Sequence, residues 1–491
     1  MGVFKKIPLF LFFLVLFFCL HGSVENYGFI ESKEVAMLGL VITGCVLLLF
    51  LIVLIFTRNY LFAALTSFFI SLWYLFFGAI HDWVKAIPFL SFMNRYAVLL
   101  PLLIAATIVW IIYLRRHKAA HTRWTFYLNL LLLIYCCVDG FIIVKNYFTP
   151  AKKITAQVAF EYDKVKAKPN VYYLLFDEYP GYKSLKDSFA FANDSLYDLL
   201  HKKEFRMLPT FTNYDFTLFS MSSILNMRYV DSGYIQFKVS QRDLQLRANE
   251  IRNGEVFNIF KKMGYRFNNY SIFDIGEQHG VSNQNSFLPV HSLLLTDKIL
   301  HNRIIRTSGW LFTTGKLALS SWRKKYLFQH DTNNGYSEKK VIEMASGKKT
   351  VPEFCYAHFS LPHWPFYRDS AGHYNSDEII ASEASLSNRA LYLGYLKYTN
   401  TVITSLVQTI TEKDPNSIIV IMSDHGYRTF RNEKGYEPFN YNNLCAVRFP
   451  DKNYIDLKEK WSTVNFFRYL FNCEYGQNIP YLADSSVVLS Y

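Results

Sequence analysis

Residues 417–426 read Ser-Ile-Ile-Val-Ile-Met-Ser-Asp-His-Gly, and this stretch predicts the fold of the second half of the chain. Its apolar, mostly β-branched run is typical of a strand that is buried on both faces of a parallel sheet. Asp424 and His425 follow where such a strand ends, and open α/β sheets bind their ligands at that edge. A carboxylate beside an imidazole suits a divalent metal. Because a polar turn after a strand is the plain alternative, the metal prediction depends on partners elsewhere in the chain.

A second apolar run also ends in carboxylates. Residues 170–176 are followed by Asp177 and Glu178, and then by a Pro-Gly pair that is typical of a turn. Asp177, at the end of the predicted strand, is therefore a candidate metal ligand, and Glu178 is the less favoured substitute. The alternative for Asp177 is a cap on a loop or a helix.

A threonine begins a short helical pattern that is rich in hydroxyl residues. Thr217 leads the stretch 217–226. A hydroxyl at the start of a helix faces free N–H groups and the positive end of the helix dipole, a setting that favours phosphate or sulfate. A nearby metal would lower the pKa of the hydroxyl and make it a nucleophile. Thr217 is thus a candidate catalytic residue, and an ordinary N-cap is the alternative.

One histidine lies on a loop that two prolines make stiff. His363 stands between Pro362 and Pro365, after the apolar run 354–357. Its imidazole is placed to donate a hydrogen bond to a phosphoryl oxygen. The alternative is a histidine on a surface loop with no role in binding.

Long apolar runs dominate the chain up to about residue 144. A membrane-spanning helix needs roughly 20 apolar residues, and five segments come near that length: 7–21, 36–56, 61–80, 97–114 and 124–144. The first segment could also be a signal peptide. An uncleaved helix is favoured because bulky Phe residues crowd its end and no cleavage site with small residues is evident.

Basic residues beside these segments predict the orientation in the membrane. The net charge is +13, and Lys5, Lys6, Arg58 and the basic cluster 115–123 all flank apolar segments. Cytoplasmic loops carry such an excess of Lys and Arg. Five crossings from an inner amino terminus, or four after a cleaved signal peptide, both place the second half outside. No nucleic-acid-binding motif is present, so we expect no nucleic-acid partner.

The chain is predicted to consist of three parts: a transmembrane helical bundle over residues 1–148, a linker over 149–168 and an extracytoplasmic domain over 169–491. The last part is expected to be a three-layer α/β domain, with a mostly parallel sheet between helices.

Within the extracytoplasmic domain, a helix is predicted over 242–254 and is expected to continue through 256–263. A strand is predicted over 265–275. Residues 283–348 are expected to form a lid or surface helices near the bilayer, because Trp310, Leu311, Phe312, Trp322 and Tyr326 favour an interface. Core packing is the alternative for these aromatic and apolar residues.

Taken in order, these motifs resemble the alkaline phosphatase superfamily. They are most similar to its membrane-anchored sulfatase-like branch, which includes lipoteichoic acid synthases and the phosphoethanolamine transferases of lipopolysaccharide. The resemblance covers about 168–485. Beyond the motifs above, it rests on three further stretches: Tyr398-Thr399-Asn400, 439–450, and Ser462-x-Val464-Asn465-Phe466-x-Arg468.

The resemblance implies a set of site residues. Asp177, Asp424 and His425 would hold one divalent metal, Zn or Mn, and the Thr217 hydroxyl would be the fourth contact. The residues implied to contact the transferred group are His363, Glu178, Ser220 and Arg428.

Two departures from related families narrow the chemistry. The chain lacks the Cys-x-Pro-x-Arg signature that sulfatases convert to formylglycine. Two-metal phosphatases need a further histidine after the Asp-His pair, and none follows His425 here. The resemblance therefore favours a transferase, bound to the bacterial inner membrane and facing the periplasm or the outside. It would move a phosphoethanolamine or phosphoglycerol head group from a phospholipid to a cell-envelope glycan or lipid through phospho-Thr217. The alternatives are an ester hydrolase that uses the same site and a catalytically degenerate membrane protein.

Overall fold

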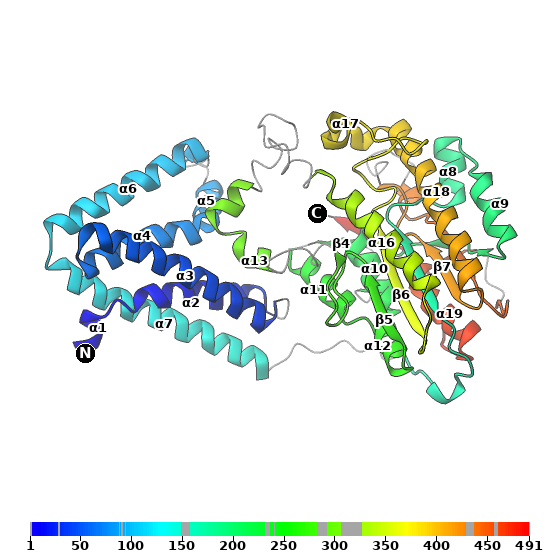
Figure 1. Ribbon diagram of the computed structural model, residues 1–491, viewed down its shortest axis with the longest axis horizontal. Helices are drawn as coiled ribbons and strands as arrows, with labels where there is room; N and C mark the ends of the chain where they lie inside the picture. Colours follow the sequence, from blue (N-terminus) through cyan, green and yellow to red (C-terminus); the bar gives the residue numbers. More distant parts are fainter. Residues whose placement is uncertain are drawn as a thin grey trace. The chain divides into compact units, whose positions relative to one another are not determined.

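The structure is a computed structural model, and the chain divides into two compact units (Figure 1). The first unit is Met1–Ile154 with Ser286–Gly309, and the second is Thr155–Asn285 with Trp310–Tyr491. The residues that the structure describes are 2–27, 30–87, 89, 92–93, 95–148, 158–230, 236–239, 241–281, 292–305, 327–428, 437–455 and 460–490.

The first unit is a bundle of apolar helices. Its sequential helices are α1 (Gly2–Lys6), α2 (Phe10–Glu25), α3 (Ser32–Thr57), α4 (Tyr60–Leu75), α5 (Phe77–Ala86), α6 (Tyr96–Arg116) and α7 (Ala120–Phe148). Of these described helices, α3, α6 and α7 are long and apolar enough to cross a membrane, and α4 with α5 forms a fourth apolar stretch that bends by 58°. All five predicted segments contain helix. By length and composition, the described residues provide three or four candidate spans; α2 is a shorter apolar helix, so the five crossings stay a prediction.

The exposed surface of these helices is apolar, as a lipid-facing surface requires. Leu40 is 76% exposed, Phe56 84% and Phe141 69%. Helix α2 instead lies in the interior of the bundle, where Phe10 and Leu14 are fully buried. Its first turn is tied to α7 because the Phe10 amide donates to the side-chain oxygen of Asn129 over 2.6 Å.

A segment from the second half of the sequence packs within the first unit. Helix α13 (Ser292–Thr296) and the residues up to 305 lie against the bundle, where Leu295 and Ile299 are 2% and 4% exposed. A Cβ on Gly22 would lie 2.9 Å from Leu295, and a Cβ on Gly78 would lie 2.8 Å from the Lys298 backbone. These two glycines therefore provide the space into which the segment fits.

An ion pair and hydrogen bonds also hold residues 292–305 against the bundle. Arg303 pairs with Asp82 and donates to the Gly78 carbonyl, while the Gly78 amide donates to the Lys298 carbonyl over 2.7 Å. The sequence predicts a lid or surface helices for this region. The aromatic and apolar residues on which that prediction rests, at 310–312, 322 and 326, lie outside the described residues.

The second unit is built on a six-stranded sheet with the order β2-β8-β7-β1-β6-β5. The strands are β1 (Val171–Phe176), β2 (Arg206–Met207), β5 (Arg266–Tyr270), β6 (Glu353–Phe359), β7 (Ile418–Met422) and β8 (Cys445–Arg448). Strands β7, β1, β6 and β5 run parallel, and β8 is antiparallel to β7. Two small sheets pair β3 (Thr210–Phe211) with β9 (Trp461–Ser462) and β4 (Gln236–Lys238) with β10 (Val488–Ser490).

Helices cover both faces of the six-stranded sheet, which confirms the predicted three-layer α/β fold. One face packs against α10 (Thr217–Asn226), α11 (Gln241–Arg252), α12 (Glu255–Lys262) and α19 (Phe466–Glu474). The other face packs against α8 (Tyr182–Phe189), α9 (Asp194–Lys202), α16 (Gln329–Ser346), α17 (Asp377–Ala381) and α18 (Arg389–Lys413). Alternation along β1 points Tyr173 and Leu175 to the first face and Tyr172 and Leu174 to the second.

Two local predictions were wrong. The helix predicted across Gly254 is broken there, because Gly254 has an extended backbone and caps α12. Strand β5 ends at Tyr270 instead of Ile275. Beyond it, Ser271 and the Asn269 side chain bond to the Phe273 carbonyl and form a turn.

Candidate metal and nucleophile site

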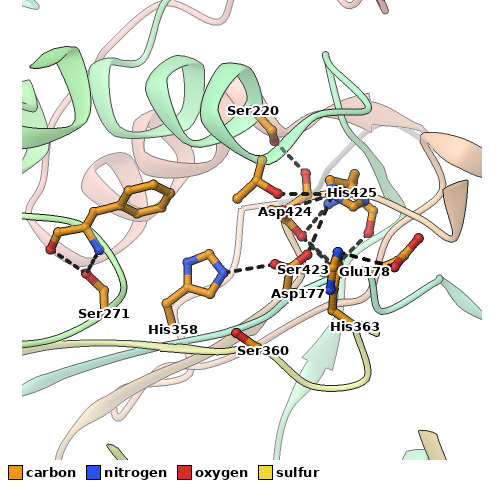
Figure 2. A network of polar contacts seen from close by, with 12 residues as sticks. Asp177, Glu178, Ser220, Ser271, His358, Ser360, His363, Ser423, Asp424 and His425 are labelled. Atoms are coloured by element: carbon orange, nitrogen blue, oxygen red, sulfur yellow. Dashed lines mark hydrogen bonds and ion pairs between the residues drawn. The ribbon is translucent and has the colours of Figure 1, made fainter. Parts of the chain in front are cut away.

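The carboxyl ends of β1 and β7 bring the predicted site residues together (Figure 2). The two strands are parallel neighbours with Leu175 opposite Met422, so the residues that follow them leave the sheet at one edge. Asp177 follows β1, and Asp424 and His425 follow β7. Long-range strand pairing therefore joins two motifs that are far apart in the sequence.

Asp177, Asp424 and His425 form a buried cluster of candidate metal ligands. One ligand atom from each residue lies within 4.8 Å of the others. His425 Nε2 lies 3.1 Å from Asp424 Oδ2 and 3.7 Å from Asp177 Oδ1. Asp424 and His425 are fully buried and Asp177 is 6% exposed. This is the only such group of three or more potential ligands in the part of the chain that the structure describes.

Thr217 adds a hydroxyl to this cluster. Its Oγ1 lies 3.3 Å from His425 Nε2, and the residue is only half-buried. Thr217 is the first residue of α10, and the N-cap position belongs to Phe216, whose side chain makes no capping bond. The alternative of an ordinary N-cap is therefore wrong, and the hydroxyl stands at the positive end of the helix beside the carboxylates.

Unpartnered oxygens test whether these residues fit a metal ion. Asp177 Oδ1 and Asp424 Oδ2 are buried without a hydrogen-bond donor, which is costly unless a cation supplies the missing partner. Asp424 Oδ1 instead accepts from the amides of Glu178 and His425. His425 Nδ1 lies 2.8 Å from the Gly426 carbonyl, to which it can only donate, so the lone pair is on Nε2, on the side of the carboxylates. Two carboxylate oxygens, an imidazole nitrogen and a hydroxyl fit one divalent cation such as Zn²⁺ or Mn²⁺.

The electrostatics of the cluster favour charged carboxylates. Burial opposes ionisation of Asp177, but the nearby imidazoles of His363, His358 and His425 outweigh it and hold the pKa of this carboxyl below its usual range. Burial and the charge of Asp177 also oppose ionisation of Asp424, and His425 still lowers its pKa. Burial and the charge of Arg428 lower the pKa of His425, but the two aspartates outweigh them and raise it. The cluster thus contains two neighbouring ionised carboxylates, which a bound cation would stabilise.

A second group of predicted residues lies beside the cluster. The Arg428 amide donates to Glu178 Oε1 over 2.9 Å, and its guanidinium lies 3.2 Å from His363 Nε2. His363 Nε2 is 3.9 Å from Glu178 Oε2 (Figure 2). Glu178 has a φ of 63°, a left-handed conformation that is strained for a side-chain-bearing residue and is frequent at functional sites. Glu178, His363 and Arg428 therefore form one polar wall beside the cluster, and their contact with a transferred group stays a prediction.

Ser220 has a different place from the one predicted. Its Oγ donates to the Asp424 carbonyl over 2.5 Å, and the residue is 1% exposed. The hydroxyl thus ties α10 to the loop that carries Asp424 and His425. Substrate contact by Ser220 stays a prediction that these bonds do not support.

His358 is the residue that sequence reasoning missed. It lies opposite Leu175 in the β1–β6 pairing, on the same face of the sheet as Asp177. Its side chain is fully buried, and its Nε2 has no hydrogen-bond partner and lies 3.6 Å from Asp177 Oδ2. A histidine within an otherwise apolar central strand was the available signal, but only the strand register shows which carboxylate it faces.

Comparison with known proteins gives one family match. Residues 234–468 match the family model described as Sulfatase. No curated protein sequence matches the chain significantly.

Three similar solved structures have 11–12% identity to the chain. The zinc complex of the periplasmic domain of EcEptC from Escherichia coli has 12% identity and a TM-score of 0.39, with coverage of 65% of this chain and 85% of that one. The soluble domain of lipooligosaccharide phosphoethanolamine transferase A from Neisseria meningitidis has 11% identity and a TM-score of 0.38, over 63% and 89%. The putative sulfatase yidJ from Bacteroides fragilis has 12% identity and a TM-score of 0.39, over 67% and 77%. Within the second half of the chain, residues 234–468 are thus similar in sequence to the Sulfatase family.

Proposed function

We propose that the protein is a membrane-anchored, metal-dependent transferase that uses Thr217 as its nucleophile. It moves a phospho-head group from a phospholipid to a glycan or lipid of the cell envelope. The observation that carries the proposal is the Thr217 hydroxyl, 3.3 Å from His425 Nε2 and beside two buried carboxylate oxygens that lack donors. A degenerate, non-catalytic protein would have no reason to retain these four groups together.

The reaction has two balanced steps. In the first, Thr217 Oγ bonds to the phosphorus of the lipid and the bond from phosphorus to the glycerol oxygen breaks. The proton of the Thr217 hydroxyl ends on the departing diacylglycerol. In the second, a hydroxyl of the acceptor bonds to phosphorus, the Thr217 Oγ–phosphorus bond breaks, and the acceptor proton restores the threonine.

The residues around Thr217 would bind the metal and stabilise the negative charge that develops during this group transfer. Asp177, Asp424 and His425 would hold the cation, which when bound lowers the pKa of a hydroxyl and neutralises phosphoryl charge. The amide groups in the first turn of α10 and the guanidinium of Arg428 face the developing negative charge and stabilise it. The Glu178 carboxylate in turn orients the Arg428 backbone through the 2.9 Å bond to its amide.

We also assign a positioning role to His358. Tyr356 OH lies 3.3 Å from His358 Nδ1, and a bond donated to Nδ1 leaves the imidazole proton on Nε2. That proton faces Asp177 Oδ2 and would leave Oδ1 for the cation. Such bonds behind a ligand commonly set its orientation and the affinity of the site.

The apolar helices of the first unit support two parts of the proposal: a phospholipid donor, and a second unit on the outer side of the membrane. A phospholipid phosphate lies at the membrane surface, so a site on a chain anchored there meets it at high effective concentration. Residues 292–305 pack at Gly22 and Gly78, which lie at the helix ends that the basic flanks place outside. This supports a bacterial inner-membrane protein whose second unit is periplasmic or outer.

The test follows phospholipid that carries a label in its head group. The full chain in lipid nanodiscs with Zn²⁺ or Mn²⁺ should release diacylglycerol and carry the label on Thr217, as mass spectrometry would show. Thr217→Ala should abolish both results. Ser223→Ala is the matched control, because Ser223 lies on the same helix but bonds to the Arg228 carbonyl, and it should keep activity.

The fate of the label separates transfer from hydrolysis. Label on a glycan or lipid supports the transferase, whereas free head group from all added substrate supports an ester hydrolase with the same site. Diacylglycerol release by Thr217→Ala at the wild-type rate would rule out both enzymes as proposed.

A further inference from the structure

A cavity of about 790 Å³ opens beside the candidate site in the second unit. This volume is within the range of roughly 300–1,000 Å³ that is typical of small-ligand sites. Its walls come from 181–183, 207–211, 441–445 and the single residues Tyr197, Phe439, Lys460 and Ser486. None of the residues assigned to the metal or to Thr217 chemistry lines it.

Sheet topology places this cavity at the same edge as the candidate site. Strand β8 is antiparallel to β7 with Cys445 opposite Met422, so β8 begins where β7 ends. Strand β2 is antiparallel to β8, so β2 ends at that edge as well. The cavity walls at 207–211 and 441–445 therefore border the carboxyl ends of the strands, where parallel sheets bind ligands.

The walls continue the loops that carry the site. The cavity residue Gly181 follows Asp177 and Glu178 in one loop, and its amide donates to the Asn442 carbonyl over 3.0 Å. The Gly426 amide, next to His425, donates to the Asn440 carbonyl over 2.8 Å. A Cβ on Gly426 would overlap the Phe439 carbonyl, so these two loops pack backbone against backbone.

The lining of the cavity is aromatic and positively charged. Tyr182 is 44% exposed, and Phe211, Phe439 and Tyr441 are half-buried. Lys183 and Lys460 are exposed, and the Lys460 ammonium lies 4.8 Å from the Phe211 ring centre. Among the described residues, no Asp or Glu lines the cavity and neither lysine forms an ion pair.

Among the described residues of the lining, one buried polar atom has no hydrogen-bond partner. The Tyr197 hydroxyl is buried without a hydrogen bond, although its ring packs edge-on against Tyr182. Burial raises the pKa of this phenol, so it stays a neutral donor at ordinary pH.

We propose that this cavity is the acceptor subsite and binds a sugar ring that carries an anionic group, a carboxylate or a phosphate. The apolar face of a sugar ring packs on aromatic side chains, and the two lysines neutralise the anion. A cationic ethanolamine head group would meet two lysines and no carboxylate here, which disfavours the donor as the occupant. The assignment to an acceptor rests on the proposed transferase function.

Binding is tested first, in the Thr217→Ala full chain, where no turnover can occur. The probes are glucuronic acid, glucose 1-phosphate and glucose, observed by saturation-transfer NMR with inorganic phosphate as a competitor. Both anionic sugars should bind at least about 10-fold more tightly than glucose, a difference of about 1.4 kcal/mol. Lys183→Glu with Lys460→Glu should remove that preference, and Lys202→Glu, an exposed lysine outside the lining, should retain it.

Equal binding of all three sugars, or an unchanged preference in the double lysine variant, would overturn the inference. Displacement of both anionic sugars by inorganic phosphate at equal concentration would also overturn it, because the sugar ring would then contribute nothing.

Turnover separates this inference from the proposed function. With labelled phospholipid and an acidic glycan, the double lysine variant should still load Thr217 but pass most of the label to water instead of the acceptor. If wild-type Thr217 never becomes labelled, the proposed function fails, and the binding result stands alone. If Thr217 is labelled and the double variant transfers as well as wild type, only the acceptor subsite is wrong.

Discussion

Replacement of His358 by Phe should weaken metal binding without unfolding the protein. Phe keeps a buried aromatic ring on β6 but removes the N–H that faces Asp177 Oδ2 at 3.6 Å. The substitution also removes Nδ1, the acceptor of the buried Tyr356 hydroxyl at 3.3 Å, so a modest loss of stability should accompany the loss of metal affinity. Asp177 then loses the contact that orients it toward the site.

The magnitude follows from the geometry. A hydrogen bond to a charged group contributes about 1.5–3 kcal/mol, and the 3.6 Å contact is too long for such a bond, so its electrostatic contribution should lie just below that range. About 1.4 kcal/mol is a factor of ten in affinity, so the metal Kd should rise about 10-fold. Loss of a partner behind a ligand commonly costs about 10–100-fold, which agrees with this value.

Competition with a coloured chelator measures the Kd for Zn²⁺ and Mn²⁺ in the purified full chain. His358→Gln, which keeps an N–H donor, should recover part of the loss. Cys355→Ala is the matched control, because Cys355 is buried on the same strand but faces the opposite side of the sheet. It should lower the melting temperature and leave the Kd unchanged.

The result that would refute this reasoning is specific. His358→Phe would bind metal as tightly as wild type, while Asp424→Asn loses binding. Metal would then occupy the site, but His358 would have no part in positioning Asp177.

Three further outcomes are expected. Metal added at about 100 times its Kd should stabilise the second unit by about 2.7 kcal/mol, and thermal unfolding with and without chelator checks this. Burial, with the nearby Asp451 carboxylate, raises the pKa of Glu474 to about 9. Glu474 therefore does not lower the free energy of unfolding below its unfolded-state pKa, and it lowers that free energy progressively as the pH rises toward 9. With allowance for its partial exposure, Glu474→Gln should stabilise the fold by on the order of 1–2 kcal/mol at about pH 8 and by almost nothing at about pH 4, and an equal gain at both values would contradict the assignment. Gly78→Val should displace residues 292–305, seen as faster amide exchange there, whereas Gly44→Val, with open space around its Cβ position, should not; unchanged exchange in both variants would contradict the packing.

The sequence by itself determined the elements and the chemistry that ends them. Apolar, β-branched runs followed by Asp177 and by Asp424 with His425 predict strands with ligands at their ends, because both signals are local. Long apolar runs likewise predict the membrane unit, since crossing a bilayer requires length and hydrophobicity within one segment. The place of Thr217 at the start of a helix is also a local property.

Only the tertiary structure decided which distant groups meet. His358 faces Asp177 because β1 and β6 pair in one register, and a shift by one residue would turn it to the other face. Ser220 bonds to the Asp424 carbonyl, and residues 292–305 lie against Gly22 and Gly78, through contacts between segments that are far apart in sequence. Such contacts depend on the free energy of the whole packed chain, so no local pattern of residues encodes them.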